Sequence, residues 1–197
     1  MADSLAPDGV KPLLQGRFGH VYHYAEVAPS TQRMLADDDG EGAVAVAEEQ
    51  TAGRGRLGRS WEAPAGTSVL VSVLLLPAVE AARLPELSLV AGGAVTEAIA
   101  AATGLKPTLK FPNDVLIFGR KVAGILAESS DGRVVLGIGV NVNQTREQLP
   151  PDAQTEPTSL RVELGEPVDR PRLLAAILFR LEQAYDAWIA TGTSASG

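Results

Sequence analysis

The chain has 197 residues, of which 45% are hydrophobic and 21% charged, so it is long enough to bury the core of one globular domain. Its net charge of −7 argues against general binding to nucleic acids or anionic membranes, and the absence of cysteine excludes a thiol nucleophile, a disulfide framework and cysteine-ligated zinc. The first residues lack a secretory signal, and no apolar run reaches the ~18 residues that span a membrane, so we expect a cytoplasmic protein.

The first part of the chain predicts strands separated by polar segments. Residues 1–19, rich in glycine, proline and charge, are interpreted as a leader that precedes the domain. Ser30 and Thr31 have side chains typical of a helix N-cap and predict a short helix to about residue 38. Apolar and β-branched runs predict strands over residues 21–27, 44–49 and 68–76.

The rest of the chain predicts two long helices around a series of short strands. Pro85 marks the start of a helix that runs to about Ala102 and that Gly104 ends. Strands are expected over residues 108–111, 114–118, 121–129 and 133–142, with hairpin turns at 118–120 and 130–132. These strands are followed by a polar loop over 144–156, a short helix over 158–163, an amphipathic helix over 170–189 and a tail over 191–197.

This mixture of hairpins and long helices predicts an α+β domain over residues 20–190. Its sheet is expected to be mixed and largely antiparallel, with helices flanking it.

Three arginines and three glycines lie within residues 53–59 of this acidic chain. Glycine allows the backbone to approach a ligand closely, and arginine supplies planar, permanently charged donors for carboxylate or phosphate. The segment therefore predicts a loop that binds a small anionic ligand. The alternative is an exposed arginine-rich loop without a ligand.

Residues 53–58 also spell the pattern Gly-x-Gly-x-x-Gly of dinucleotide-binding folds. That motif needs a helix that begins within the glycines, so that its N-terminus faces the pyrophosphate. Here Pro64 and Gly66 prevent such a helix, and the next predicted element is the strand over 68–76. A strand, a long loop and another strand do not form a dinucleotide-binding unit.

Two further segments place polar residues beside apolar strands, namely 110–114 (Lys-Phe-Pro-Asn-Asp) and 121–126 (Lys-Val-Ala-Gly-Ile-Leu). Asn113 and Asp114 have two equally good interpretations, as part of a binding site or as ordinary turn residues after a proline. Lys121 fits either a ligand contact or a charge that flanks an edge strand. A third segment, 137–143, places two glycines and two asparagines in a β-rich run, and glycine within a strand marks close approach by a ligand or another strand.

Together, in this order and spacing, these segments resemble the biotin protein ligases from about Tyr24 to Asn143, with a looser match through the C-terminal helix. The family pattern Gly-Arg-Gly-Arg-x-Gly-Arg-x-Trp is complete at Gly53 to Trp61. The pattern Lys-Trp-Pro-Asn-Asp occurs at 110–114 with Phe111 in place of tryptophan. The remaining family patterns are Lys-x-x-Gly-Ile-Leu at 121–126, Gly-x-Gly-x-Asn at 137–141, and Ser-Thr-Asn, which occurs as Ser-Thr-Gln at 30–32.

The resemblance implies a biotin/lipoate ligase catalytic domain, related to class II synthetases, that works in two steps. The biotin carboxylate attacks the α-phosphate of MgATP to give biotinyl-5′-adenylate and pyrophosphate, and a lysine of a biotin carboxyl carrier protein then displaces AMP. Two residues are expected to be catalytic, Lys121 as a cation that bridges the carboxylate and the α-phosphate, and Arg56 as a residue that closes the loop over the adenylate. Trp61 is expected to cover the ligand and exclude water.

The resemblance also implies two sets of ligand contacts. Biotin is expected to contact Ser30, Thr31, Gln32, Gln50, Gly53, Arg54, Gly55, Arg56, Trp61, Lys121 and Gly124. ATP or the adenylate is expected to contact Arg54, Arg56, Arg59, Trp61, Lys110, Asn113, Asp114, Lys121, Gly139 and Asn141. Mg²⁺ is expected to be held mainly by the ATP phosphates, and Asn113, Asp114 and Asn141 can hold phosphate, ribose or the metal ion.

Two expectations concern domains that relatives carry. About twenty residues precede the first predicted strand, so we expect neither a winged helix-turn-helix domain nor repressor function. No strand is predicted after Ile189, so the C-terminal SH3-like domain of relatives is expected to be absent. The alternatives are a lipoate-type ligase, for which the glycine–arginine loop is the wrong type, and a module that binds biotin or its adenylate without transfer. Nucleic acid and membranes are not expected as partners.

Overall fold

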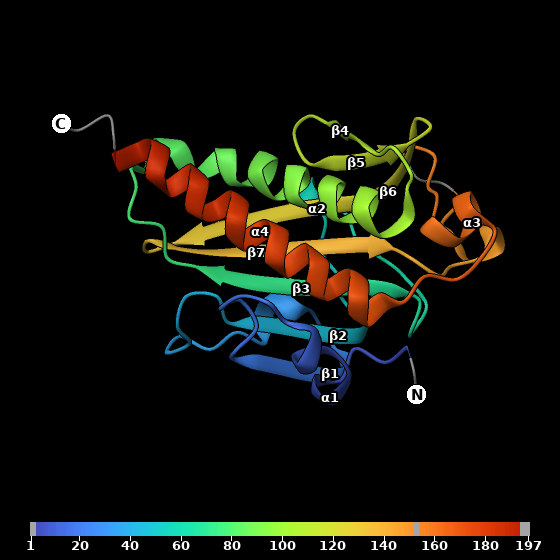
Figure 1. Ribbon diagram of the computed structural model, residues 1–197, viewed down its shortest axis with the longest axis horizontal. Helices are drawn as coiled ribbons and strands as arrows, with labels where there is room; N and C mark the ends of the chain where they lie inside the picture. The colour runs from blue at the N-terminus through green and yellow to red at the C-terminus, as the bar shows by residue number, and fades with distance from the viewer. Residues whose placement is uncertain (1–2, 152–153, 194–197) are drawn as a thin grey trace.

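The computed structural model describes residues 3–151 and 154–193, and its framework is a seven-stranded sheet in the order β1-β2-β3-β7-β6-β5-β4 (Figure 1). The strands are β1 (Tyr22–Ala28), β2 (Val44–Gln50), β3 (Ser68–Leu75), β4 (Thr108–Lys110), β5 (Asp114–Ile117), β6 (Arg120–Ser130) and β7 (Arg133–Asn141). β1 pairs with β2 in parallel, and the other neighbouring strands pair antiparallel. The predicted α+β class with a mixed, largely antiparallel sheet is confirmed.

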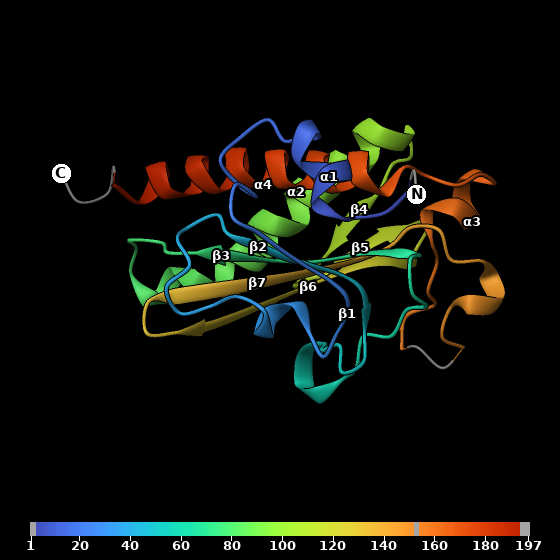
Figure 2. The same ribbon diagram turned by 90° about the horizontal axis from the view of Figure 1, so that it is seen from below.

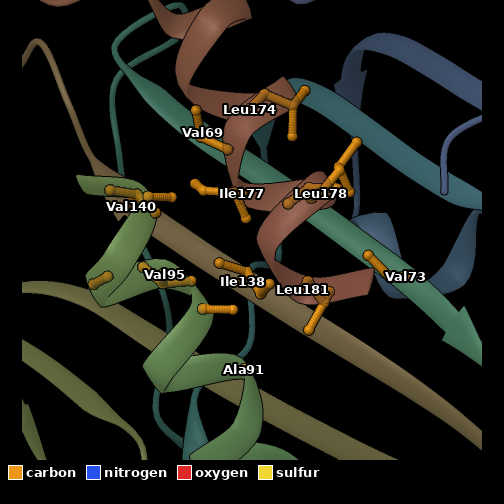
Figure 3. Close-up of a cluster of buried hydrophobic side chains, with 14 of the residues drawn as sticks. Val69, Val73, Ala91, Val95, Ile138, Val140, Leu174, Ile177, Leu178 and Leu181 are labelled. Carbon is orange, nitrogen blue, oxygen red and sulfur yellow. The ribbon is translucent and has the colours of Figure 1, made fainter. Parts of the chain in front are cut away.

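Two long helices, α2 (Leu87–Thr103) and α4 (Arg170–Thr193), pack together on one face of this sheet (Figures 1 and 2). α4 directs Leu174, Ile177, Leu178 and Leu181 toward the sheet, at the spacing of one helix face (Figure 3). They pack against strand residues that include Val69, Val73, Ile138 and Val140 (Figure 3). Gly104 ends α2 in the left-handed conformation, as its position in the sequence predicts.

The remaining helices are short. They are α1 (Pro7–Val10), α3 (Leu160–Leu164) and 3₁₀ turns at Lys11–Leu13, Thr31–Arg33, Arg56–Gly58, Ala81–Glu86 and Arg146–Gln148. The 3₁₀ turns at Thr31–Arg33 and Arg56–Gly58 lie on the face of the sheet opposite α2 and α4 (Figure 2). Over the described part of the chain, no long helix covers this face.

The segment interpreted as a leader is packed into the domain over its described residues, 3–19. Leu5, Val10 and Phe18 are buried in the hydrophobic core. The buried guanidinium of Arg170 at the start of α4 is paired with Asp3 at 2.9 Å and with Glu48 of β2 at 2.7 Å. An ion pair to a buried arginine and three core side chains hold this segment against the sheet and α4.

Two other expectations differ from the structure. Ser30 makes no cap hydrogen bond, and only a 3₁₀ turn, Thr31–Arg33, follows it, because Thr31 bonds to β2 and β3 instead. α4 continues to Thr193 through the start of the expected tail, whose residues 194–197 lie outside the described part of the chain. The stretch Ala81–Thr103 is long and apolar enough to cross a membrane by length and composition, but α2 buries Leu87, Ala91 and Val95 in the core of the domain.

Candidate active site

A cleft of about 670 Å³ opens between the sheet and the loop that joins β2 to β3. It is lined by nearly all of the residues that the sequence predicted to contact ligands: Ser30, Thr31, Gln32, Gln50, Arg54, Gly55, Arg56, Arg59, Trp61, Asn113, Asp114, Lys121, Gly124, Gly139 and Asn141. These residues come from five separate segments of the chain. The fold therefore gathers the sequence motifs around one cavity of the size that a small-molecule ligand needs.

The floor of the cleft is formed by glycines of β6 and β7. Gly124 and Gly139 face each other across the two strands, and the indole ring of Trp61 lies over both. A Cβ atom on Gly139 would lie 2.6 Å from the Trp61 ring, and one on Gly124 would lie 2.9 Å from it. Both positions therefore need glycine so that Trp61 can reach the sheet.

One end of the cleft carries neutral hydrogen-bonding groups. Gln50 Oε1 accepts a hydrogen bond of 2.8 Å from the Thr31 amide, and the Thr31 and Ser72 hydroxyls lie 2.8 Å apart. Ser30 beside them is 2% exposed. Buried neutral donors and acceptors of this kind suit an uncharged polar ring better than an ion.

Lys121 supplies a cation to the lining of the cleft. Its Nζ lies 2.7 Å from an Asp114 carboxylate oxygen and 5.6 Å from the centre of the Trp61 ring. Both side chains of the ion pair are largely shielded, with 22% of Lys121 and 17% of Asp114 exposed. A partly desolvated ammonium group can interact with a bound anion more strongly than one in water.

Residues 53–61 form a small hairpin over the cleft, here called the lid. Its base is closed by hydrogen bonds from the Trp61 amide to Gly53 O at 2.9 Å and from the Gly55 amide to Arg59 O at 2.7 Å. A Cβ atom on Gly53 would lie 2.2 Å from Trp61 O, so this base needs glycine at position 53. Leu57 at the tip has a φ of 59° and is 90% exposed.

The three arginines of the lid each contact a different element. Arg54 makes a two-pronged ion pair with Glu128 of β6, at 2.9 and 2.5 Å. Arg56 donates to Asn113 Oδ1 at 3.2 Å, and Arg59 donates to Gln154 Oε1 at 3.0 Å. The guanidinium groups therefore fasten the lid around the mouth of the cleft.

Asn141 at the end of β7 has a fixed amide. Its Nδ2 donates to Thr158 O at 3.0 Å, and its Oδ1 accepts from Gln144 Nε2 at 3.0 Å. The Gln144 contact could not be predicted from the sequence, because Gln144 begins a polar run that was expected to be a loop. The backbone of Thr158 also pairs with Lys121 O at 2.8 Å, which joins this segment to the start of β6.

Two predicted residues do not line the cleft, Gly53 and Lys110. Gly53 lies at the base of the lid, and Lys110 Nζ donates to Thr155 Oγ1 at 3.3 Å. Lining residues outside the two predicted contact sets are Ser60, Glu62, Val71, Ile125, Leu126, Gly137, Ile138, Pro150, Pro151, Gln154, Thr155 and Pro157. Within residues 3–151 and 154–193, no group of three or more acidic or histidine side chains is arranged to hold a metal ion.

Comparisons with known proteins agree on one family. The model of the biotin/lipoate A/B protein ligase family matches residues 24–144. The chain is 38% identical over 178 residues to a bifunctional ligase/repressor BirA of Bacillus spizizenii, covering 86% of this chain and 55% of that protein. It is 43% identical over 161 residues to a biotin–[acetyl-CoA-carboxylase] ligase of Mycobacterium tuberculosis, covering 79% of this chain and 59% of that protein.

Solved structures give the same answer. The biotin protein ligase of Aquifex aeolicus in complex with biotin and ATP matches with a TM-score of 0.79 and 34% identity, over 87% of this chain and 72% of that one. The biotin protein ligase of Leishmania major in complex with biotinyl-5-AMP matches with a TM-score of 0.69 and 26% identity, over 86% and 76% of the two chains. The chain belongs to the biotin/lipoate A/B protein ligase family. It spans a little over half the length of the two curated relatives.

Proposed function

We propose that this protein is an ATP-dependent biotin ligase that makes biotinyl-5′-AMP and transfers the biotinyl group to a lysine of a biotin carboxyl carrier protein. The observation that carries the proposal is the position of Lys121. Its ammonium group lies 2.7 Å from Asp114 and 5.6 Å from the centre of the Trp61 ring, and Asn113 and Asn141 line the same cleft. A partly buried cation in the cleft can offset the repulsion between two anions that are being joined.

In the first step, the biotin carboxylate forms a bond to the α-phosphorus of ATP and the bond to pyrophosphate breaks. Thr31 and Gln50 offer neutral hydrogen bonds to the ureido ring, and the Trp61 indole offers apolar contact to the valeryl chain. Lys121 offsets the charge that builds up between the carboxylate and the phosphate. When bound, Mg²⁺ would be held mainly by the ATP phosphates and would offset their charge. Relatives solved with biotin and ATP and with biotinyl-5-AMP support biotin and ATP as the substrates.

In the second step, the amine of a carrier lysine attacks the acyl carbon of the anhydride. The new C–N bond forms, AMP leaves with the electron pair of the broken bond, and the amine loses a proton. Until then the lid protects the anhydride, because Trp61 and the hairpin over it exclude water. We propose the carrier protein as the partner, and the relatives named as BirA and as a carboxylase ligase support this partner. We propose the cytoplasm as the location, because ATP and carboxylases are both found there.

The test is transfer of labelled biotin to a purified carrier domain, with ATP omitted and with the acceptor lysine of the carrier changed to arginine as controls. We expect label on the carrier only when ATP and the acceptor lysine are both present. Formation of the adenylate without transfer would reduce the function to adenylate binding. Preferential use of lipoate over biotin would assign the chain to the other branch of the family. No ATP-dependent labelling at all would overturn the proposal.

A further inference from the structure

We propose that Gln144, which lies behind the cleft wall, is a positioning residue that presets the amide of Asn141 for the nucleotide. The inference rests on the proposed function, since it takes ATP to be the ligand at Asn141. Asn141 lines the cleft, whereas Gln144 is only 1% exposed and touches no part of it. Of the two side chains that Gln144 Nε2 bonds, Asn141 and Ser68, only Asn141 lines the cleft.

A chain of hydrogen bonds fixes the direction of both amides. A backbone carbonyl can only accept, so Thr158 O requires that the nitrogen of Asn141 faces it. Asn141 Oδ1 then faces Gln144 and requires a donor, which Gln144 Nε2 supplies at 3.0 Å. The same Nε2 donates to Ser68 Oγ at 2.7 Å, so both of its hydrogens are used.

The fixed amide of Asn141 offers the cleft a defined pattern. Its nitrogen carries a second hydrogen beyond the one bonded to Thr158 O, and its oxygen keeps a second lone pair beyond the one that Gln144 occupies. Because these groups are held before the ligand arrives, little conformational freedom is lost when it binds.

The amide oxygen of Gln144 argues against a role in stability alone. Among the described residues, its Oε1 is buried without a hydrogen-bond partner, which is unfavourable for folding. An apolar side chain of similar length would avoid this unpaired oxygen. What such a side chain would lack is the donor for Asn141.

Asn113 provides an internal contrast. Its Nδ2 is likewise anchored on a backbone carbonyl, Ile125 O at 3.0 Å. The donor to its oxygen is Arg56 of the lid, at 3.2 Å. The amide oxygen of Asn113 therefore receives its hydrogen bond from the lid, whereas that of Asn141 receives it from Gln144 in the body of the domain.

The experiment compares Gln144→Met with two controls. Gln148→Met makes the same change at an exposed glutamine of the same segment. Ser68→Ala removes the other partner of Gln144 and leaves its bond to Asn141 in place. The measurements are the affinities for ATP and for biotin alone by calorimetry, the KM for ATP and kcat in adenylate formation, and a melting curve.

We expect Gln144→Met to weaken ATP binding and raise the KM for ATP about fivefold, the effect of one neutral hydrogen bond, with biotin affinity and the melting temperature close to those of the parent. Gln148→Met should leave ATP and biotin affinity unchanged, with at most a small loss of stability because Gln148 Oε1 accepts a capping hydrogen bond from the Thr145 amide. Ser68→Ala should affect ATP binding less than Gln144→Met. Unchanged ATP affinity in Gln144→Met overturns the proposal, as does an equal loss for ATP and biotin with a lowered melting temperature. A parent protein that binds ATP but makes no adenylate overturns the proposed function alone, and the ATP affinities still decide the role of Gln144. A parent protein that binds no ATP overturns both.

Discussion

The floor and the lid of the cleft are held by different kinds of contact. The floor belongs to β6 and β7, whose other face is packed under α2 and α4, and its polar residues bond to buried backbone. The lid is held by side chains at the surface, of which the Arg54–Glu128 pair is 46% and 36% exposed. Exposed pairs contribute roughly 0–1 kcal/mol each, so the lid opens at a lower free energy than the floor. The floor therefore suits positioning of the reacting groups, and the lid suits their retention and release.

The largest effect is expected on the floor at Lys121. Lys121→Ala should slow adenylate formation by a factor on the order of 10²–10³, because two anions lose the cation between them. ATP–pyrophosphate exchange measures the rate, and a melting curve should show a protein that still folds with a loss of about 1–3 kcal/mol, because the shielded Asp114 carboxylate loses its partner. Lys106→Ala, at an exposed position outside the cleft, is the matched control. A folded Lys121→Ala protein that exchanges at the parent rate would remove Lys121 from the mechanism.

The second effect concerns opening of the lid. Amide exchange of residues 53–61 should slow by up to about 100-fold when biotin and ATP are present at ~100 times their Kd, because opening must then release the ligands. Amides of β6 and β7 behind the cleft, which open only with the domain, should already exchange more slowly than the lid when no ligand is present, and should slow by a similar factor on binding because unfolding also releases the ligands. Mass spectrometry of exchanged peptides measures both regions. Equal exchange rates of the lid and of these strands in the ligand-free protein would show that they open together.

The contact between floor and lid is tested at Gly139. Gly139→Ala should lower stability by about 1–3 kcal/mol and weaken biotin binding, because the added methyl group pushes Trp61 away from the sheet. Gly137→Ala is the matched variant on the same strand, where the nearest atom to a new Cβ belongs to Gln32 at 3.4 Å, an ordinary contact. Urea unfolding and tryptophan fluorescence measure the difference. If the two variants behaved alike, close approach of Trp61 would not be what the glycine serves.

Arg56 tests retention by the lid. Arg56→Gly should leave adenylate formation partly intact and raise escape of the intermediate on the order of tenfold, since the charged hydrogen bond to Asn113 is lost. The escaping adenylate should label lysines of bystander proteins, which a blot for biotin detects. An unchanged level of bystander labelling, with adenylate still formed, would contradict a retaining role for Arg56.

The smallest effect lies outside both regions, at Asp186 of α4. Its hydrogen bond from Arg17 holds the pKa of the Asp186 carboxyl below its ordinary value. The pair therefore stabilises the fold above the ordinary pKa of an aspartate, and this contribution is lost as the pH falls through the lowered value. Because the pair is exposed, Asp186→Asn should lower stability by less than about 1 kcal/mol at neutral pH and by nothing in strong acid. Urea titrations at several pH values check this, and a constant difference at every pH would refute it.

The sequence predicted the elements that have a local signature. The strands and hairpins follow from β-branched runs and turn residues, and the end of α2 from Gly104. It did not predict contacts whose partners lie far along the chain. Arg54 lines the cleft, as its predicted ligand contact requires, but its pairing with Glu128, 74 residues away, was not predicted.

Residues without periodicity were missed for a related reason. Leu5, Val10 and Phe18 enter the core from a segment whose composition resembles a leader, so only the fold reveals their burial. Gln144 begins a polar run and is indistinguishable there from a loop residue, although its side chain is enclosed. Composition averages over a segment, whereas burial is decided residue by residue.

The base of the lid sets how freely this segment can vary in sequence. At Gly53 even one added carbon would collide with the backbone of Trp61, whereas the side chain of Leu57 projects into solvent. The space around Gly58 is open, and its positive φ of 76° is the main restriction there. Substitutions should therefore accumulate at the tip of the hairpin and be eliminated at its base. The turn can then diversify among descendants of this chain while the base of the lid stays the same.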